Sequence, residues 1–320
     1  MLNFQSFKNI FDLYFSSNVS FILFFNILIF VFLKLAFELS ISNMNVFKNF
    51  ILNLLIFLFF PFTSLSQKNL HGPSLNGKKV IYVYGGMKGH SPKESVNLFV
   101  PILEKEGASV KVFDNFSVYE DEKLMNEADL IIQIFTDAFT SDPRMNNDQF
   151  KGLRNALVNG TGFAGWHGGL GDSSPNPLYH FIVGGNFVTH PGELKEMKTA
   201  EYGVKIYDKE DYITNGISDF KISGSEQYYM MIDPNVKVLA VSEFKLNNWP
   251  TDENEIKGSF MPVVWKKNYG KGRVFYSSIG HYLREFEIPE VLTMQIRGFR
   301  WASEGKYHPK ENLISPVYKK

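Results

Sequence analysis

The sequence has 320 residues, long enough for one large domain or two ordinary ones, and its first 66 residues are far more apolar than the remainder. Its 33 basic and 33 acidic side chains balance to a formal net charge of 0, so the chain lacks the basic surplus of a nucleic-acid-binding protein. A hydrophobic content of 44% excludes a disordered chain, and the absence of Cys excludes a disulfide framework, a thiolate zinc site and a cysteine nucleophile.

Two apolar runs, residues 19–33 and 50–62, occupy the N-terminal part of the chain. Charged residues interrupt both before they reach the roughly 20 apolar residues of a membrane span. The second run follows Met44 and a single Lys, and it precedes small residues that place a cleavage site between Ser66 and Gln67. This order of segments is typical of a secretory signal peptide.

The chain is therefore expected to be exported, to the periplasm or outside the cell. The alternative is a membrane-anchored protein that keeps its apolar segments, residues 19–62. The predicted segments are an extra hydrophobic N-terminus or over-extended gene start (1–43), a signal peptide (44–66), a linker (67–77), one folded domain (78–305) and a C-terminal tail (306–320).

Strands and helices alternate along the first half of the folded part. We predict strands at 78–85, 109–114, 128–135 and 161–166, and helices at 92–107, 121–127 and 148–159. This alternation predicts a mostly parallel, doubly wound α/β sheet with helices on both faces and right-handed crossovers. Ligands bind such sheets beyond the carboxyl ends of the strands.

The second half is richer in strands and turns. We predict strands at 197–207, 236–243, 261–267 and 272–278, with residues 268–271 turning the last pair as a hairpin. Residues 289–304 form a closing helix with Pro289 in its first turn.

Four histidines follow predicted strands or stand in the next turn. They are candidate metal ligands or general acids and bases, since imidazole titrates nearest neutrality. The alternative for each is a loop histidine that bonds to the backbone. The four are His90, His167, His190 and His281, whereas His71, His180 and His308 are expected to be structural.

The segment GWHGG (165–169) predicts a sharp turn from strand to helix, because small residues flank its central side chain. Such an elbow presents the central residue, here His167, at the rim of the sheet. Histidine is not an acyl nucleophile, so elbow geometry is expected without hydrolysis through Ser or Cys. The spacing of Gly85, Gly86 and Gly89 fits no nucleotide-binding motif, and no nucleotide is expected.

Carboxylates and aromatic rings complete the candidate site. Glu226, or less directly Asp172, would give the imidazoles an acid/base partner or a mixed oxygen and nitrogen metal site. A lone carboxylate is otherwise a solvated surface group. Aromatic side chains near these positions are candidates for stacking on sugar rings, with core packing as the alternative. They are Trp166, Trp265, Tyr228 and Tyr282.

Five ordered motifs resemble the ThuA-like (trehalose-utilisation) family. They are GWHGG (165–169), GGNFVTHP (184–191), NGISDF (215–220) with EQYY (226–229), MPVVWKKNYGKGRVFYSSIGH (261–281) and FRWASEG (299–305). The resemblance implies a class I glutamine-amidotransferase-like, flavodoxin-like fold and a role in catabolism of disaccharides and their keto derivatives. In the related amidotransferases the elbow carries a Cys, and His167 stands in that place here.

The resemblance and the residues together predict an exported protein that acts on a sugar or keto-sugar by His and Glu acid–base chemistry, with a divalent metal as a candidate cofactor. A non-catalytic sugar-binding or accessory protein is the alternative. The partner is a small carbohydrate, and any membrane contact would come from an uncleaved N-terminus. Predicted roles are catalysis (His167, Glu226, His281), substrate binding (Trp166, His190, Tyr228, Tyr282) and metal binding (His90, His167, His190).

Overall fold

The computed structural model describes residues 72–137, 144–191, 200–245 and 255–313. The chain divides into two compact units, Met1–Gly72 and Pro73–Lys320, and the fold described below is that of the second. The predicted signal peptide, the segment before it and the alternative membrane anchor lie outside the described residues. Within the described ranges, no helix is long and apolar enough to cross a membrane.

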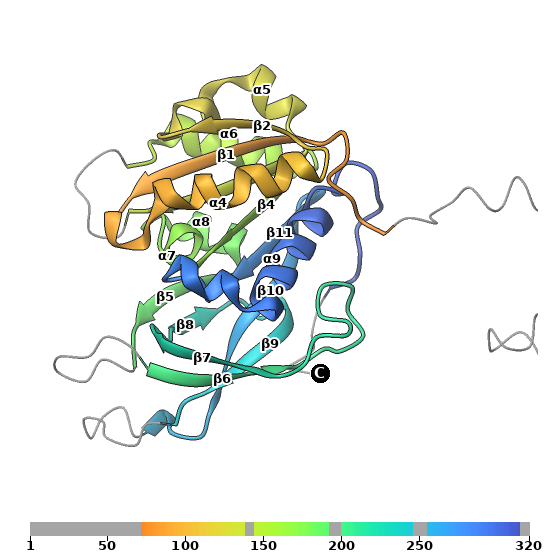
Figure 1. The fold of residues 1–320 in the computed structure, drawn as a ribbon. Coiled ribbons are helices and arrows are strands. Elements are labelled where there is room, and N and C mark those ends of the chain that lie inside the picture. The colour runs from red at the N-terminus through yellow and green to blue at the C-terminus, as the bar shows by residue number, and fades with distance from the viewer. Residues whose placement is uncertain (1–71, 138–143, 192–199, 246–254, 314–320) are drawn as a thin grey trace, which may run out of the picture. The chain divides into compact units, whose positions relative to one another are not determined.

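Parallel strands form one half of a nine-stranded sheet, in the order β2, β1, β3, β4, β11 (Figure 1). This is the flavodoxin-like order, in which the first strand lies between the second and the third. The predicted doubly wound α/β fold is confirmed. The strands are β1 (Lys79–Gly86), β2 (Ser109–Phe113), β3 (Leu130–Thr136), β4 (Gly162–Trp166) and β11 (Gly272–Ser277).

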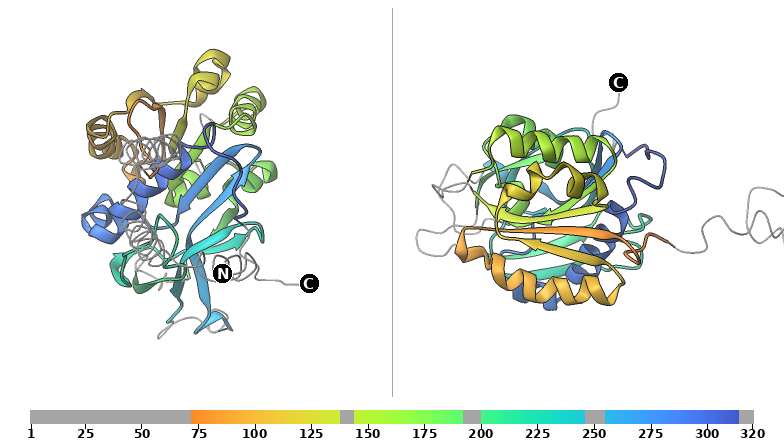
Figure 2. Two further views of the ribbon diagram at one scale, coloured as in Figure 1. Left: turned by 90° about the vertical axis from the view of Figure 1, so that its right-hand side faces the viewer. Right: turned by 90° about the horizontal axis from the view of Figure 1, so that it is seen from above.

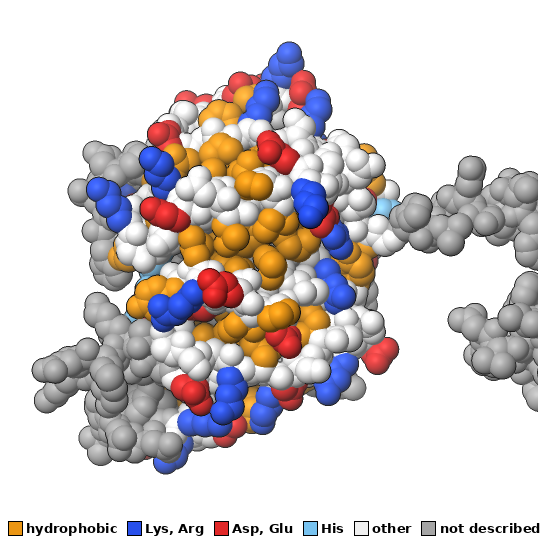
Figure 3. Space-filling view, in the orientation of Figure 1, with side chains coloured by type: hydrophobic (Ala, Val, Ile, Leu, Met, Phe, Trp, Pro, Cys, Tyr) orange, Lys and Arg blue, Asp and Glu red, His pale blue; other side chains and the backbone are white. Residues whose placement is uncertain are grey.

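Helices cover both faces of this half, as the view from above shows (Figure 2). One core lies under α4 (Pro92–Lys105) and α9 (Pro289–Ala302), and the other lies under α5 (Glu122–Glu127), α6 (Asn147–Val158) and α8 (Pro177–Val183). All seven residues of β3 are buried, as expected for a strand with helices on both sides. Acidic and basic side chains are interspersed over the face that carries α4 and α9 (Figure 3).

The sheet continues beyond β11 with antiparallel strands, in the order β10, β9, β6, β7. A separate two-stranded sheet pairs β5 with β8. The strands are β5 (Gly185–Thr189), β6 (Ala200–Ile206), β7 (Phe220–Ser225), β8 (Tyr229–Ile232), β9 (Lys237–Glu243) and β10 (Phe260–Tyr269).

The predicted elements of the first half are all present, with ends that differ by about two residues or fewer. In the second half the sequence analysis missed β7 and β8, and it gave no bounds for β5, the strand implied before His190. These strands are short, and β7 (FKISGS) lies at an edge of the large sheet. Short strands outside the sheet centre carry little of the apolar patterning that a strand prediction depends on.

The hairpin between β10 and β11 is tighter than predicted. Strand β10 extends to Tyr269 and β11 begins at Gly272, so Gly270 and Lys271 alone form the loop. Gly270 has a φ of 60°, the left-handed value that the first central residue of a type II′ turn requires.

Candidate active site

His167 is the first residue of a short helix, α7 (His167–Gly171), which directly follows strand β4. Its φ of 49° lies in the left-handed region, which residues with a side chain rarely adopt. The glycine after it lets His90 approach, because a Cβ at Gly168 would lie 2.8 Å from His90 Cε1. The geometry expected of GWHGG is therefore present, with His167 at the carboxyl end of β4.

Hydrogen bonds hold the His167 ring in one orientation. Its Nδ1 lies 2.9 Å from the carbonyl oxygen of Ser278. A carbonyl oxygen only accepts, so Nδ1 carries a proton and the neutral ring presents a lone pair at Nε2. That nitrogen lies 2.7 Å from the Tyr228 hydroxyl and 3.0 Å from Glu226 Oε2. Because the His167 side chain is buried, the Tyr228 hydroxyl and Glu226 Oε2 remain the neighbours of this nitrogen.

Glu226 is the centre of the histidine cluster. It stands in the short connection between β7 and β8 and is 6% exposed. Besides its contact with His167, its Oε2 lies 2.9 Å from His190 Nε2 and 3.1 Å from His281 Nδ1. One carboxylate oxygen thus meets nitrogens from three histidines.

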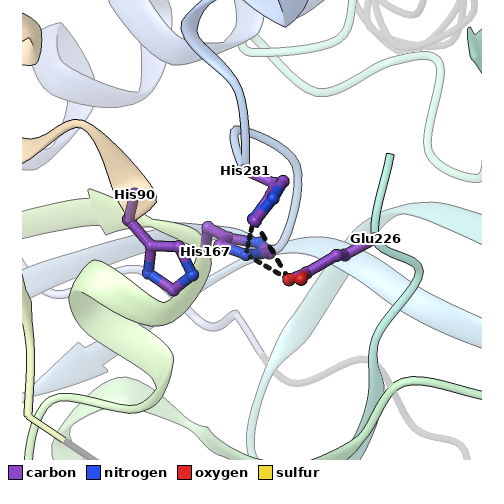
Figure 4. A group of neighbouring side chains, drawn as sticks. All are labelled: His90, His167, Glu226 and His281. Carbon is purple, nitrogen blue, oxygen red and sulfur yellow. Dashed lines mark hydrogen bonds and ion pairs between the residues drawn. The ribbon is translucent and has the colours of Figure 1, made fainter. Parts of the chain in front are cut away.

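His90 completes a compact group of possible ligands. It ends the 3-10 helix η1 (Lys88–His90), and its Nδ1 lies 2.8 Å from the Thr136 hydroxyl. Its ring centroid is 4.8 Å from that of His167 and 5.2 Å from that of His281. One ligand atom from each of His90, His167, Glu226 and His281 lies within 4.8 Å of the others, and the four side chains converge from separate segments (Figure 4).

Burial and neighbouring charges determine the protonation of these groups. Burial, with the nearby His167 and His281, lowers the pKa of His90 to about 3. Burial also lowers the pKa of His167. For Glu226, burial raises the pKa, but the contacts of its carboxylate with three histidines outweigh this effect and hold the pKa well below its ordinary value. At neutral pH the Glu226 carboxylate therefore lies beside the neutral ring of His167.

Three supporting residues were missed by the sequence analysis. Thr136 is the last residue of β3 and Ser278 follows β11, so the rule that sites form at the carboxyl ends of strands could have indicated both. Glu285, which is 3% exposed, accepts hydrogen bonds from the Ser225 hydroxyl and from the Gly280 amide at 2.8 Å. It thereby ties together the residues that precede Glu226 and His281. No local sequence pattern indicated this role.

The aromatic residues divide between the core and the site. The prediction that Trp166 binds substrate is wrong: its side chain is 1% exposed and packs on Phe99 and Phe286, with ring centroids 4.7 and 5.0 Å away. Trp265 is likewise buried, and its indole N–H donates to a backbone carbonyl. Strand alternation turns these two rings toward opposite faces of the sheet, where each belongs to one of the two cores. Tyr282, in contrast, is partly exposed, with its ring 4.1 Å from that of His281.

The predicted metal set of His90, His167 and His190 differs from the compact group in one member. The compact group contains His281 and Glu226 in place of His190, because His190 approaches from the segment after β5 and contacts Glu226 Oε2 instead. His308 pairs with Glu304 away from the cluster, and His180 lies on α8. His71 lies outside the described residues.

Replacing Asp172 by Asn is expected to change how stability depends on pH. Burial, with the nearby Asp137, raises the Asp172 pKa to about 7, although His190 opposes the shift. Because the folded chain holds the Asp172 proton more tightly than the unfolded chain, this carboxyl group stabilises the fold fully below its unfolded pKa of about 4. The stabilisation is lost as the pH rises through the folded pKa of about 7.

The difference in Tm between Asp172→Asn and the original chain should therefore rise in favour of the variant from about pH 4 to about pH 8, because only the carboxyl ionises. Differential scanning fluorimetry at each pH measures the difference. A difference that stays flat across this range would contradict the pKa shift.

The model of the ThuA family, described as trehalose utilisation, matches residues 79–302. The chain belongs to this family. The match contains every residue of the cluster, from His90 to His281. A search of curated proteins found no match to the chain.

Solved structures show the same fold in other ThuA-like proteins. The chain is similar to a putative ThuA-like protein from Bacteroides uniformis, with 18% identity and a TM-score of 0.57 over 74% of this chain and 94% of that chain. A putative ThuA-like protein from Parabacteroides merdae is also similar, with 18% identity and a TM-score of 0.53 over 73% and 92% of the two chains. At this level of identity the likeness concerns the fold.

Proposed function

We propose that this ThuA family member is an exported enzyme of carbohydrate utilisation that transfers protons on a sugar or keto-sugar of the disaccharide class. The observation that carries the proposal is the contact of one Glu226 oxygen with His167, His190 and His281 at 2.9–3.1 Å. Imidazoles beside a carboxylate are the usual equipment for general acid–base catalysis. The family description supports a carbohydrate as the substrate.

The exposed fractions of the three histidine side chains indicate which of them can reach a substrate. The side chains of His190 and His281 are 19% and 11% exposed, whereas that of His167 is 1% exposed. In the proposed mechanism His281 removes a proton from a hydroxyl group or from the carbon beside a keto group. His190 returns a proton to the oxygen that gains negative charge.

Glu226 and His167, whose side chains are more deeply buried than those of His190 and His281, assist this transfer. The carboxylate stabilises the imidazolium that forms when His281 takes up a proton. His167 contacts both Glu226 and His281, and its bond to Ser278 keeps its ring in place. Tyr282 offers a ring beside His281 against which a sugar can stack. This chemistry fits isomerisation or elimination of a keto-sugar and requires no covalent nucleophile.

The test is turnover by the full chain. Trehalose, other disaccharides and their keto derivatives are incubated with the purified protein, and proton NMR follows loss of substrate and growth of product. At least one keto-disaccharide is expected to be converted. If substrates bind and none is converted, the accessory sugar-binding role replaces catalysis, and if none binds, the carbohydrate assignment fails.

Export is tested separately by N-terminal sequencing of the mature protein. Cleavage after Ser66 is expected, because small residues precede that position after the apolar run. A mature chain that starts at Gln67 and is recovered outside the inner membrane would agree with the proposal. A chain that keeps residues 19–62 and sediments with membranes would favour the anchored alternative.

A further inference from the structure

Three ligand atoms in the cluster form a nearly equilateral triangle. The distances are 3.0 Å between His167 Nε2 and Glu226 Oε2, 3.1 Å between His281 Nδ1 and Glu226 Oε2, and 3.1 Å between the two nitrogens. Adjacent ligands of an octahedral ion with bonds of about 2.1 Å lie roughly 3 Å apart. The triangle therefore has the size of one face of such a coordination sphere.

The lone pairs on these atoms also favour the binding of a cation. His167 Nε2 presents a lone pair, since the other ring nitrogen donates to Ser278, and the Glu226 carboxylate presents only lone pairs. Lone pairs about 3 Å apart repel each other unless positive charge lies among them. Two imidazoles and a carboxylate on one face are a ligand set that divalent transition metals accept in proteins.

A second observation concerns the far side of the rings. His167 donates through Nδ1 to the Ser278 carbonyl, and His90 Nδ1 contacts the Thr136 hydroxyl at 2.8 Å. Histidines that bind metals are oriented in this way by hydrogen bonds to their other nitrogen. With Nδ1 engaged, His90 has Nε2 left to serve as a fourth ligand, in keeping with its place in the compact group.

The backbone holds these ligands in place. His167 is on the elbow of β4 and α7, while Glu285 bonds to Ser225 and to Gly280, the neighbours of Glu226 and His281. Two neighbouring groups compete with an ion for these atoms: the Tyr228 hydroxyl lies 2.7 Å from His167 Nε2, and His190 Nε2 lies 2.9 Å from Glu226 Oε2. An ion at His167 Nε2 would turn the Tyr228 hydroxyl toward another acceptor.

We propose that His167, His281, Glu226 and His90 bind one divalent transition-metal ion at the carboxyl ends of the parallel strands. The ligands leave room in an octahedral sphere for oxygens of water or of a substrate. The inference deepens the proposed function, on which its catalytic meaning rests: in the metal-bound chain His281 would serve as a ligand, proton transfer would fall to His190, and the ion would polarise a hydroxyl or keto oxygen of the sugar.

The test measures metal binding directly. The full chain is stripped with EDTA, desalted and titrated in separate experiments with Zn²⁺, Mn²⁺ and Co²⁺ by calorimetry, and bound metal is counted by mass spectrometry after dialysis. One ion per chain is expected. Co²⁺ should add absorption bands in the visible region, which report its coordination and need no turnover.

Variants locate the ion. Glu226→Gln keeps the shape of a ligand and should weaken binding by at least about 100-fold, while Thr136→Val removes only the bond that orients His90 and should weaken it by about 10–100-fold. His308→Gln, a histidine substitution outside the cluster, should leave the affinity unchanged. Circular dichroism of each variant checks that it is folded.

Saturable uptake of none of the three ions would overturn the inference, and so would uptake that Glu226→Gln and Thr136→Val leave unchanged. These failures differ from failure of the proposed function. An ion that binds to a chain without sugar turnover would leave the metal site standing alone. Turnover that continues in the stripped chain would leave the acid–base function standing without it.

Discussion

Substitution of Glu226 by Gln should lower kcat on any converted sugar by roughly 10²- to 10⁴-fold, the range by which a positioned acid–base group accelerates a reaction. The amide keeps the size of the side chain and removes its charge. It therefore cannot stabilise an imidazolium at His281 or His190, both of which contact the carboxylate within 3.1 Å. Steady-state kinetics of the two proteins measures the effect.

Glu201→Gln is the matched control for this experiment. Glu201 forms an exposed ion pair with Lys221, and such pairs contribute little. This variant should keep the kcat of the original chain. A Glu226→Gln protein that is folded and turns over sugar at nearly the original rate would remove Glu226 from the mechanism.

Phe99→Ala is expected to lower the free energy of unfolding by about 3–5 kcal/mol, the usual cost of truncating a buried Phe. The Phe99 side chain is fully buried on α4. Its ring centroid lies 4.7 Å from that of Trp166, 4.9 Å from that of Phe286 and 5.7 Å from that of Phe299. The variant loses these contacts and leaves a cavity under the elbow. Urea denaturation followed by circular dichroism measures the loss.

Phe181→Ala makes the same chemical change at a side chain on α8 that is 59% exposed. Its effect should stay within about 0.5 kcal/mol, because no buried contact is removed. If the two variants lose equal stability, the core between α4 and the sheet is not packed as described. Phe99→Ala is also expected to loosen the packing of Trp166 and so to disturb His167, the next residue in the chain.

The alternation of strands and helices and the place of His167 followed from local pattern. Buried strands such as β3 and amphipathic helices such as α4 have periodicities that depend on nearby residues. The elbow was predictable for the same reason, because small residues around position 167 permit the left-handed backbone there. The carboxyl-end rule then brought His90 and His167 to one rim.

The sequence by itself thus determined the α/β fold, the elbow and a set of candidate histidines, all of which depend on short-range pattern. Only the tertiary structure decided that Glu226 lies among His167, His190 and His281, since that meeting depends on strand pairings between distant segments. It also decided that Trp166 belongs to the core. The sequence shows which residues of a strand alternate between the two faces of the sheet. Which side chains pack against each face depends on the helices that cover the sheet.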